Sequence, residues 1–188
     1  MMQRYFAAIT IVLLVIMVIF RVFMLRKMGI KAMKFGGIDK KDFIIIPFVL
    51  LFFFLIFSNT LKLQWLSIDL LRNEIISWIG VVLCMFGLLL FLYSLISFGK
   101  SFRVGIDEDK PGALITTGAF AISRNPIYTA FGLVLLGIFL TFANWILLLY
   151  LIAGLWLFNR QVLREEDSLK RIYGKEYMEY SKKVHRYL

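Results

Sequence analysis

Long apolar runs separated by short polar segments dominate the pattern of this 188-residue chain. The first three runs predict membrane-spanning helices at about 5–25, 43–61 and 75–98. A helix rises 1.5 Å per residue, so about 20 apolar residues cross a hydrocarbon core of about 30 Å. The third run places Gly80 and Gly87 two turns apart, and small residues on one face favour close packing of membrane helices.

A fourth apolar stretch, from 127 to 159, is too long for one ordinary span. Asn144 is a good helix N-cap and Trp145 is a residue type that settles at membrane interfaces, so a tight turn is expected there. The stretch therefore predicts a helical hairpin with spans at about 127–142 and 145–158. The tail after it predicts an amphipathic cytoplasmic helix, which Gly174 bends or divides.

Composition supports a membrane protein of the all-α class. Hydrophobic residues make up 61% of the chain and charged residues 18%, and the mean hydropathy is +0.82. These values exclude most soluble enzymes and disordered chains. One cysteine, Cys84, cannot form an intramolecular disulfide, so a disulfide-stapled module is excluded as well. We expect a single integral membrane domain over residues 1–188, with five transmembrane helices.

The distribution of basic residues predicts the orientation of these helices. The chain has a formal net charge of +10, with 22 basic and 12 acidic residues. The segments 26–42, 99–125 and 160–188 hold six, four and eight basic residues, which is 18 of the 22. Five spans place all three segments on one side, and the positive-inside rule makes that side cytoplasmic. The N-terminus is then outside and the C-terminus in the cytoplasm, and a nucleic-acid partner is not expected.

The segment before the fourth span is the first candidate for chemistry. Asn125 and Pro126 form a typical helix start, because proline loses nothing by lacking an N–H at the first helical position. A helix N-terminus attracts anions such as carboxylates, and Arg124 and Tyr128 stand beside it. The alternative is that Arg124 only flanks the membrane and Tyr128 is an ordinary interfacial residue.

The second candidate is the acidic group that follows the last span. Glu165, Glu166 and Asp167 are unusual so close to a basic membrane face, and they can hold a cationic or hydroxylated ligand. The alternative is that Glu166 pairs with Lys170 at i,i+4 while its neighbours are solvated. Both candidate segments lie on the same predicted side, so they can meet.

Several common catalytic motifs are missing from the sequence. There is no phosphate-binding loop, dinucleotide fingerprint, Cys/His metal spacing or serine elbow, and the single histidine, His185, belongs to the tail. We expect no bound metal. Methyl transfer from S-adenosylmethionine (SAM) is one reaction that needs none of these motifs, because the cofactor carries its own leaving group.

Three motifs in the C-terminal half resemble a known superfamily. They read Gly112-Ala-Leu-Ile-Thr-Thr-Gly-Ala-Phe120, then Arg124-Asn-Pro-Ile-Tyr128, then Glu165-Glu-Asp-Ser-Leu169 with Tyr173-Gly174, Tyr177 and Tyr180. In this order they resemble the integral-membrane methyltransferases that include isoprenylcysteine carboxyl methyltransferases and phospholipid N-methyltransferases. The resemblance covers about residues 99–188.

The resemblance implies a helical bundle whose loops and tail close over SAM at the cytoplasmic face. It implies three groups of cofactor-binding residues: Gly112, Ala113, Leu114, Ile115 and Phe120 for the adenosine part, Asn125, Pro126 and Tyr128 for the methionine part, and Glu165 and Glu166 for amino or hydroxyl groups. A cationic sulfonium suits nearby acids and aromatic rings.

The resemblance also implies a lipophilic acceptor that enters from the bilayer. Its substrate-binding arginine falls at Gln161 here, with Arg160 and Arg164 as neighbours, and Arg124 is a candidate catalytic residue for orienting an anion. Isoprenylcysteine carboxyl O-methylation is the leading hypothesis. A phospholipid amine and a lipophilic thiol are alternative acceptors. The alternative of another class is a non-catalytic helical membrane subunit.

Overall fold

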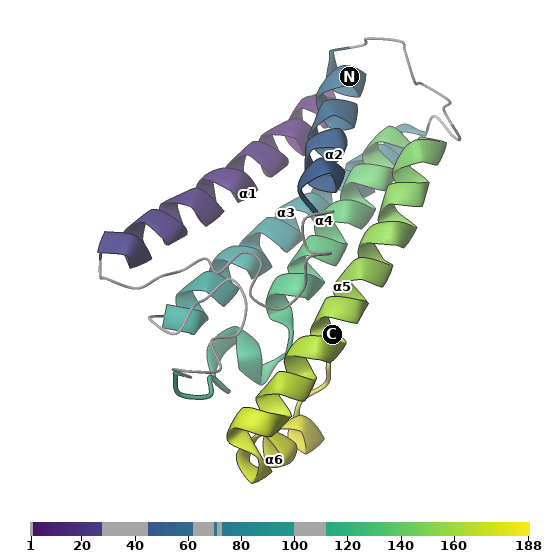
Figure 1. Cartoon of the computed structure of the whole chain (residues 1–188). Helices are drawn as coiled ribbons and strands as arrows, with labels where there is room; N and C mark the ends of the chain where they lie inside the picture. The colour runs from purple at the N-terminus through teal and green to yellow at the C-terminus, as the bar shows by residue number, and fades with distance from the viewer. Residues whose placement is uncertain (1, 28–44, 62–69, 71–72, 100–111) are drawn as a thin grey trace.

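The computed structural model describes residues 2–27, 45–61, 70, 73–99 and 112–188 (Figure 1). Within these ranges every regular element is a helix, which confirms the all-α prediction. The helices are α1 (Met2–Lys27), α2 (Ile45–Thr60), α3 (Glu74–Phe98), the short η4 (Gly118–Ala121), α4 (Pro126–Phe142), α5 (Trp145–Tyr173) and α6 (Lys175–Lys183).

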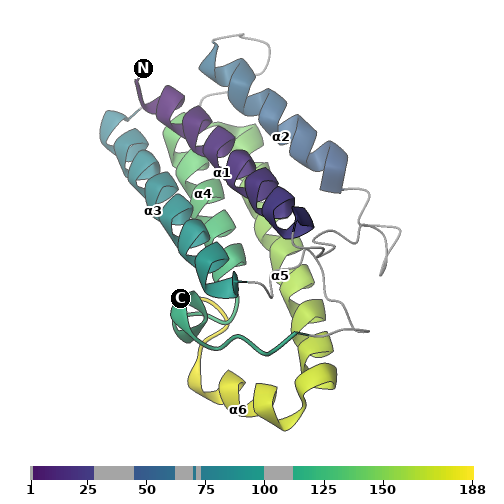
Figure 2. The same cartoon turned by 90° about the vertical axis from the view of Figure 1, so that its left-hand side faces the viewer.

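The five long helices run alternately up and down in one bundle (Figures 1 and 2). Three of them, α1, α3 and α5, are long and apolar enough to cross a membrane, whereas α2 and α4 are apolar but shorter. The first four predicted spans agree with α1 to α4 to within three residues at each end. The count of five membrane crossings stays a prediction.

The fifth predicted span lies within a longer helix, so the prediction of a separate tail helix directly after it is wrong. The sequence predicts a span that ends at Phe158 and a separate tail helix, but α5 continues unbroken for 29 residues to Tyr173. The reason is that hydropathy falls after Phe158 while no glycine or proline interrupts the helix until Gly174. Gly174, with φ of 52°, ends α5 and precedes α6, so the prediction that it divides the tail is confirmed.

Helices α3 and α4 pack against each other through glycines. A Cβ atom added at Gly80 would lie 2.5 Å from the Gly137 carbonyl oxygen, and one added at Gly137 would lie 2.6 Å from the Gly80 oxygen. At Gly87 it would lie 2.9 Å from the Ala130 oxygen. The close packing predicted from Gly80 and Gly87 is thus confirmed, and Cys84 is buried in the same interface.

The turn between α4 and α5 is formed as predicted. Asn144 accepts a hydrogen bond from the Ile146 N–H at 2.7 Å, so it is the N-cap of α5. At the opposite end of the bundle, Nη2 of Arg21 in α1 donates to the Gly99 carbonyl at the end of α3.

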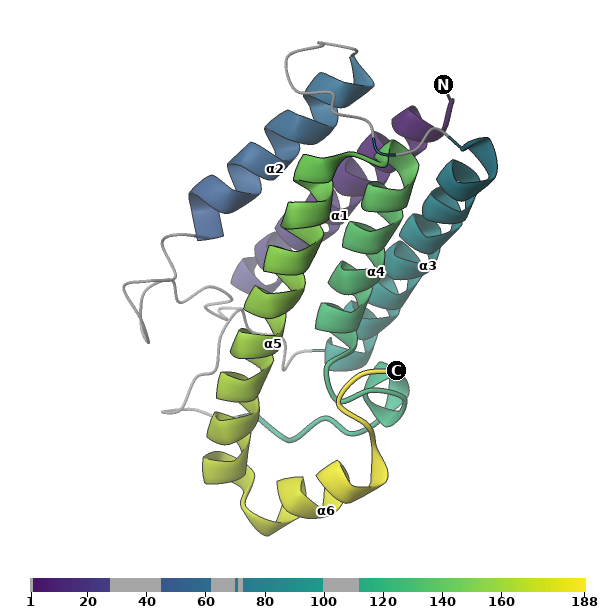
Figure 3. The same cartoon turned by 90° about the vertical axis from the view of Figure 1, so that its right-hand side faces the viewer.

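That opposite end also holds η4, the start of α4, the polar half of α5, α6 and the C-terminus (Figures 2 and 3). The prediction that the two candidate segments share one end of the bundle is therefore confirmed. Residues 28–44, with most of the basic residues of the first loop, and 100–111, the beginning of the predicted cofactor loop, lie outside the described residues.

Candidate functional site

The site is built where α4 begins beside the polar half of α5. Pro126 is the first residue of α4, as the sequence predicts. Asn125 occupies the N-cap position, as predicted, but its side chain makes no capping bond. Its Nδ2 donates instead to Glu166 Oε1 at 3.1 Å and to the Arg186 carbonyl at 3.3 Å. A buried carboxylate is a stronger acceptor partner than a neutral group, so the side chain turns toward α5.

One turn into α4, Tyr128 contacts Glu165 across the two helices. The Tyr128 hydroxyl donates to Glu165 Oε1 at 2.6 Å, and Gln161 Nε2 donates to the same oxygen at 3.1 Å. Among the described residues, no donor bonds to Glu165 Oε2 and no cation pairs with this carboxylate. Glu165 thus offers one open oxygen, and burial raises the pKa of its carboxyl because the bonds from Tyr128 and Gln161 only partly offset the desolvation.

Aromatic rings form the membrane side of this contact. The Tyr128 ring lies 5.9 Å from the ring of Phe158 on α5, and Phe158 lies 5.7 Å from Phe131 on α4. Phe131 in turn lies 5.2 Å from Phe91 on α3. The row of rings connects the site to the core cluster that contains Phe91 and Ala130, and an aromatic ring can attract a cation.

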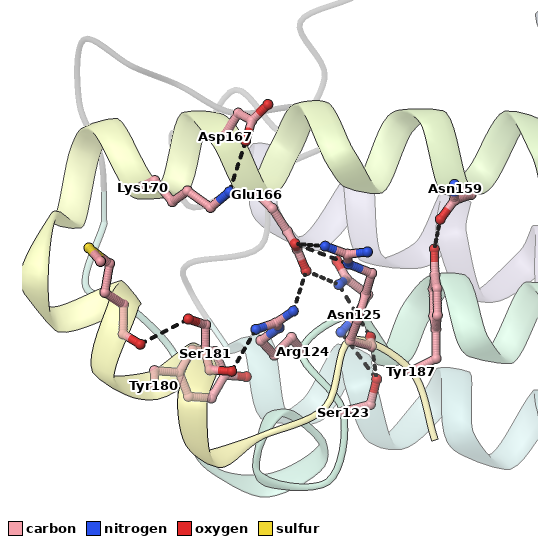
Figure 4. A network of polar contacts seen from close by, with 12 residues as sticks. Ser123, Arg124, Asn125, Asn159, Glu166, Asp167, Lys170, Tyr180, Ser181 and Tyr187 are labelled. Atoms are coloured by element: carbon pink, nitrogen blue, oxygen red, sulfur yellow. Dashed lines mark hydrogen bonds and ion pairs between the residues drawn. The ribbon is translucent and has the colours of Figure 1, made fainter.

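Glu166, the next residue, has a different environment (Figure 4). Its side chain is buried, with the residue 2% exposed, and it is held by two arginines. Arg124 Nη2 lies 3.1 Å from Oε1, and Arg186 donates from Nε at 3.1 Å and from Nη2 at 2.9 Å to Oε2. The hydrogen bond to Glu166 raises the pKa of the Arg186 guanidinium. Both oxygens of Glu166 are thus used within the protein.

The alternative considered for Glu166, a pair with Lys170, is not what the structure shows. Lys170 donates to Asp167 at 3.0 Å on the exposed face of α5, three residues away. Glu166 points the other way, into the bundle, because two arginines from distant segments give it charge-assisted bonds. Spacing along one helix could not reveal those partners.

Arg124 is engaged on both terminal nitrogens. Besides Glu166, it donates from Nη1 to the Ser181 carbonyl at 2.8 Å, and its side chain is only 12% exposed. Its backbone N–H donates to the His185 carbonyl at 2.9 Å. The residue predicted to orient a substrate anion is therefore placed as a link between the loop, α5 and the C-terminal tail.

The tail also fixes the loop that precedes η4. The Tyr180 hydroxyl donates to the Phe120 carbonyl at 2.6 Å, and burial raises the pKa of Tyr180 to about 12. Phe120 packs edge-on against Phe98 of α3 at 4.8 Å. The Tyr173 hydroxyl donates to the Gly112 carbonyl at 2.6 Å. Phe120, predicted to line the adenosine part of a pocket, is thus a packed core residue.

The remaining predicted residues differ in their position. Gly112 and Ala113 are exposed, and Leu114 and Ile115 are half-buried in a segment without regular secondary structure. Arg160 lies with its guanidinium carbon 5.9 Å from the ring centroid of Trp156, a side chain on the exposed face of α5. Gln161, rather than either neighbouring arginine, bonds to Glu165. In the described part of the chain, no group of three acidic, histidine or cysteine side chains could hold a metal ion.

Comparison with known proteins places the chain in a family. A model of the family described as phospholipid methyltransferases matches residues 75–176, which is more than half of the chain. The chain belongs to the phospholipid methyltransferase family. The match runs from α3 to the start of α6, so it includes Tyr128, Gln161 and Glu165 but ends before Arg186.

The individual relatives of the chain are named as isoprenylcysteine O-methyltransferases. The chain is 28% identical over 113 residues to a probable protein-S-isoprenylcysteine O-methyltransferase of Oryza sativa subsp. indica, covering 58% of this chain and 59% of the relative. It is 26% identical over 132 residues to the protein-S-isoprenylcysteine O-methyltransferase of Xenopus laevis, covering 69% of this chain and 42% of the relative. The chain thus spans about two fifths to three fifths of these relatives' length.

Proposed function

We propose that this protein is an integral membrane methyltransferase that binds SAM where α4 begins beside α5. The observation that carries the proposal is the 2.6 Å contact between the Tyr128 hydroxyl and Glu165, inside the segment matched by the family. It joins two motifs that lie 37 residues apart and that the family resemblance assigns to one ligand.

The charges of these residues fit the cofactor. SAM has a carboxylate, an ammonium and a sulfonium, so it needs an anion-binding and a cation-binding group close together. The start of α4 offers the positive end of a helix dipole, and Glu165 offers a carboxylate without a cationic partner among the described residues. The rings of Tyr128 and Phe158 suit a sulfonium. When bound, SAM supplies an electrophilic methyl group.

The chain's own residues then have separate tasks. Glu165 and Tyr128 bind and orient the cofactor, together with Asn125, Pro126 and the segment 112–115. Gln161 orients the Glu165 carboxylate through its 3.1 Å bond. Glu166 and Arg124, whose polar atoms lie 3.1 Å apart, hold the loop against α5.

For the acceptor, we propose the carboxylate of a lipophilic, isoprenylcysteine-like compound. The names of the relatives support this class, and an ionised carboxylate attacks a methyl group without needing a base in the protein. Arg160 and Arg164, close to the apolar half of α5, are the candidates for attracting the anion. The family description favours a second candidate, a phospholipid amine, which must first lose a proton. A thiol is the third.

We also propose that the site faces the cytoplasm. The end of the bundle that holds it receives three segments with 18 of the 22 basic residues in a five-span arrangement. A cytoplasmic site has direct access to a soluble cofactor, while the apolar faces of the helices admit a lipid-like acceptor.

Binding of S-adenosylhomocysteine to the purified protein in detergent tests the proposal. We expect saturable binding, and we expect Glu165→Gln combined with Tyr128→Phe to raise the Kd about 10- to 100-fold, because a charge-assisted bond is worth about 1.5–3 kcal/mol. Asp167→Asn is the matched control: it removes an exposed acid two residues away, and we expect an unchanged Kd. A wild-type protein without saturable binding would support the non-catalytic helical subunit instead.

Product analysis identifies the acceptor. Membranes that contain the protein are incubated with methyl-labelled SAM, and a methyl ester is detected as volatile methanol released by mild base. Label that remains on an amine lipid, or that appears as a volatile sulfide, contradicts the carboxylate assignment. Each of these outcomes still leaves a methyltransferase, so the two experiments test separate parts of the proposal.

A further inference from the structure

The last residues of the chain cross from α6 to the segment that precedes α4. The His185 carbonyl accepts the Arg124 N–H at 2.9 Å. The Arg186 carbonyl accepts the Ser123 hydroxyl at 3.2 Å and the Asn125 Nδ2 at 3.3 Å. The tail is therefore hydrogen-bonded to each of the three residues that lead into α4.

The Arg186 side chain extends to α5. Its Nε and Nη2 atoms both donate to Glu166 Oε2, at 3.1 Å and 2.9 Å. The other oxygen, Oε1, binds Arg124 at 3.1 Å and Asn125 at 3.1 Å. The Glu166 carboxylate is thus shared: one oxygen binds the tail and the other binds the segment before α4.

This arrangement ties the same two helices together twice. Asn125 and Tyr128 lie one turn apart at the start of α4, and Glu166 and Glu165 are adjacent on α5. The first tie is Asn125 to Glu166, and the second is Tyr128 to Glu165. Asn125 is close to Tyr128 along the chain, and Glu166 is next to Glu165. A movement that changes the Asn125–Glu166 bond therefore also changes the Tyr128–Glu165 bond.

We propose that Arg186 is a positioning residue for the cofactor site, acting through Glu166 on the start of α4. This inference rests on the proposed function. The two-pronged bond from Arg186 fixes the orientation of the Glu166 carboxylate, and that orientation sets where Asn125 and Arg124 lie. The positions of Asn125 and Arg124 in turn fix the first turn of α4, and Tyr128 in that turn contacts Glu165. Arg186 does not contact the ligand and lies ten residues beyond the segment that the family matches.

Loss of Arg186 has a physical consequence at a distance. A buried Glu166 Oε2 would lose its donors, and an unsatisfied buried carboxylate oxygen is costly. The carboxylate then turns toward Arg124. Because Arg124 and Asn125 are bonded to this carboxylate, the segment before α4 is displaced as well. A displacement of about 1 Å at a binding site can cost about 100-fold in function, so a remote arginine can control affinity.

The experiment measures the Kd for S-adenosylhomocysteine in a double-mutant cycle on the full-length protein. The four proteins are the wild type, Arg186→Gln, Glu166→Gln and the double variant. We expect each single change to raise the Kd about 10-fold or more, and the double variant to be no weaker than Glu166→Gln alone. Such non-additivity is the signature of a residue that acts through another.

Tyr187→Phe is the matched control. It removes the adjacent tail contact, the 3.0 Å bond from the Tyr187 hydroxyl to Asn159, without touching Glu166. We expect its Kd to equal that of the wild type. Equal weakening by Tyr187→Phe and Arg186→Gln would overturn the inference, because it would show that any loss in the tail has this effect.

Separate outcomes test the two proposals. No binding by the wild type overturns the proposed function and this inference with it. Two outcomes overturn the inference alone when the wild type binds. One is an unchanged Kd for Arg186→Gln, and the other is a Kd increase in the double variant equal to the product of the two single increases. If Arg186→Gln does not yield a monodisperse protein, Arg186→Lys replaces it; it keeps the charge but loses the two-pronged geometry. We then expect a Kd about 3-fold or more above the wild type, and an equal Kd overturns the inference.

Discussion

The two ends of helix α4 are attached to the bundle by different means. Along its apolar length, α4 lies against α3 with glycine beside glycine, so that backbone atoms are in contact; in these two described helices no charged group takes part there, and the Ser77 hydroxyl donates to the Thr141 carbonyl at 3.2 Å. At its first turn, α4 is attached to α5 and to the tail by a buried carboxylate, two arginines and an asparagine. One attachment depends on shape and the other on charge.

This difference separates the scaffold from the site. Contacts between backbones allow no variation, and they give α4 a fixed position in the bundle. Buried ion pairs cost desolvation energy and are favourable only when every partner is present, so they make the site end sensitive to single substitutions. Changes along the apolar length of α4 should therefore destroy the fold, whereas changes at the site end should be graded.

The largest effect is expected for Gly137→Leu. Its Cβ atom would lie 2.6 Å from the Gly80 oxygen and 2.8 Å from the Cys84 backbone nitrogen, so α3 and α4 cannot keep their distance. We expect no monodisperse folded protein on size-exclusion chromatography in detergent. Gly132→Ala is the control on the same helix, because its Cβ would meet only the tip of Leu155 at 3.3 Å. A normal elution profile for Gly137→Leu would contradict the close packing.

A smaller effect is expected for Glu166→Ala. It leaves Arg124 and Arg186 without their shared anion, and removing one partner of a buried ion pair costs about 3–5 kcal/mol. Thermal unfolding of the purified protein measures the loss. Asp167→Ala, which removes only an exposed pair with Lys170, should change stability by less than about 1 kcal/mol. Equal losses in the two variants would show that Glu166 is not the centre of the network.

The smallest effect is expected for Tyr180→Phe. Loss of the bond to the Phe120 carbonyl should cost about 1 kcal/mol at neutral pH. Burial raises the pKa of Tyr180 to about 12 from the ordinary tyrosine value of 10.0, so the folded protein keeps a proton that the unfolded chain loses between these values. The stabilising contribution of Tyr180 is therefore complete below pH 10 and is lost as the pH rises toward 12.

Thermal unfolding between pH 8 and 12, about the range set by the ordinary and raised tyrosine pKa, checks this expectation. The melting temperatures of the wild type and of Tyr180→Phe should differ below pH 10 and approach each other above it. Curves that stay parallel throughout would contradict burial of this hydroxyl.

The hydrophobic pattern was sufficient for the helices of this fold but not for their ends. Runs of apolar residues predicted α1 to α4, and Asn144 marked the turn before α5, because these signals are local. The end of α5 was predicted 15 residues too early. Hydropathy indicates whether a helix lies in an apolar or a polar environment, but it does not indicate where the helix ends. The end of α5 is set by Gly174, whose backbone conformation interrupts the helix.

The site was predictable in part. Motif order brought Tyr128 and Glu165 into consideration together, and the structure places them in contact. The roles of Asn125 and Glu166 could not be inferred, because they depend on Arg186, which is 61 residues from Asn125 and 20 from Glu166. A single basic residue near the end of a chain with 22 of them carries no signal in the sequence.

Because α5 is unbroken, it fixes the distance of Glu165 from the apolar part of the helix. Its last long apolar run ends at Phe158, and Glu165 follows seven positions later on the same helix, about 10 Å further along the axis. Glu165 therefore stands at a set height above the apolar boundary. Under the proposed function, an acceptor anchored among lipid tails has to extend its reactive group to that level, so the rigid helix would select acceptors by the distance between their apolar anchor and their polar end.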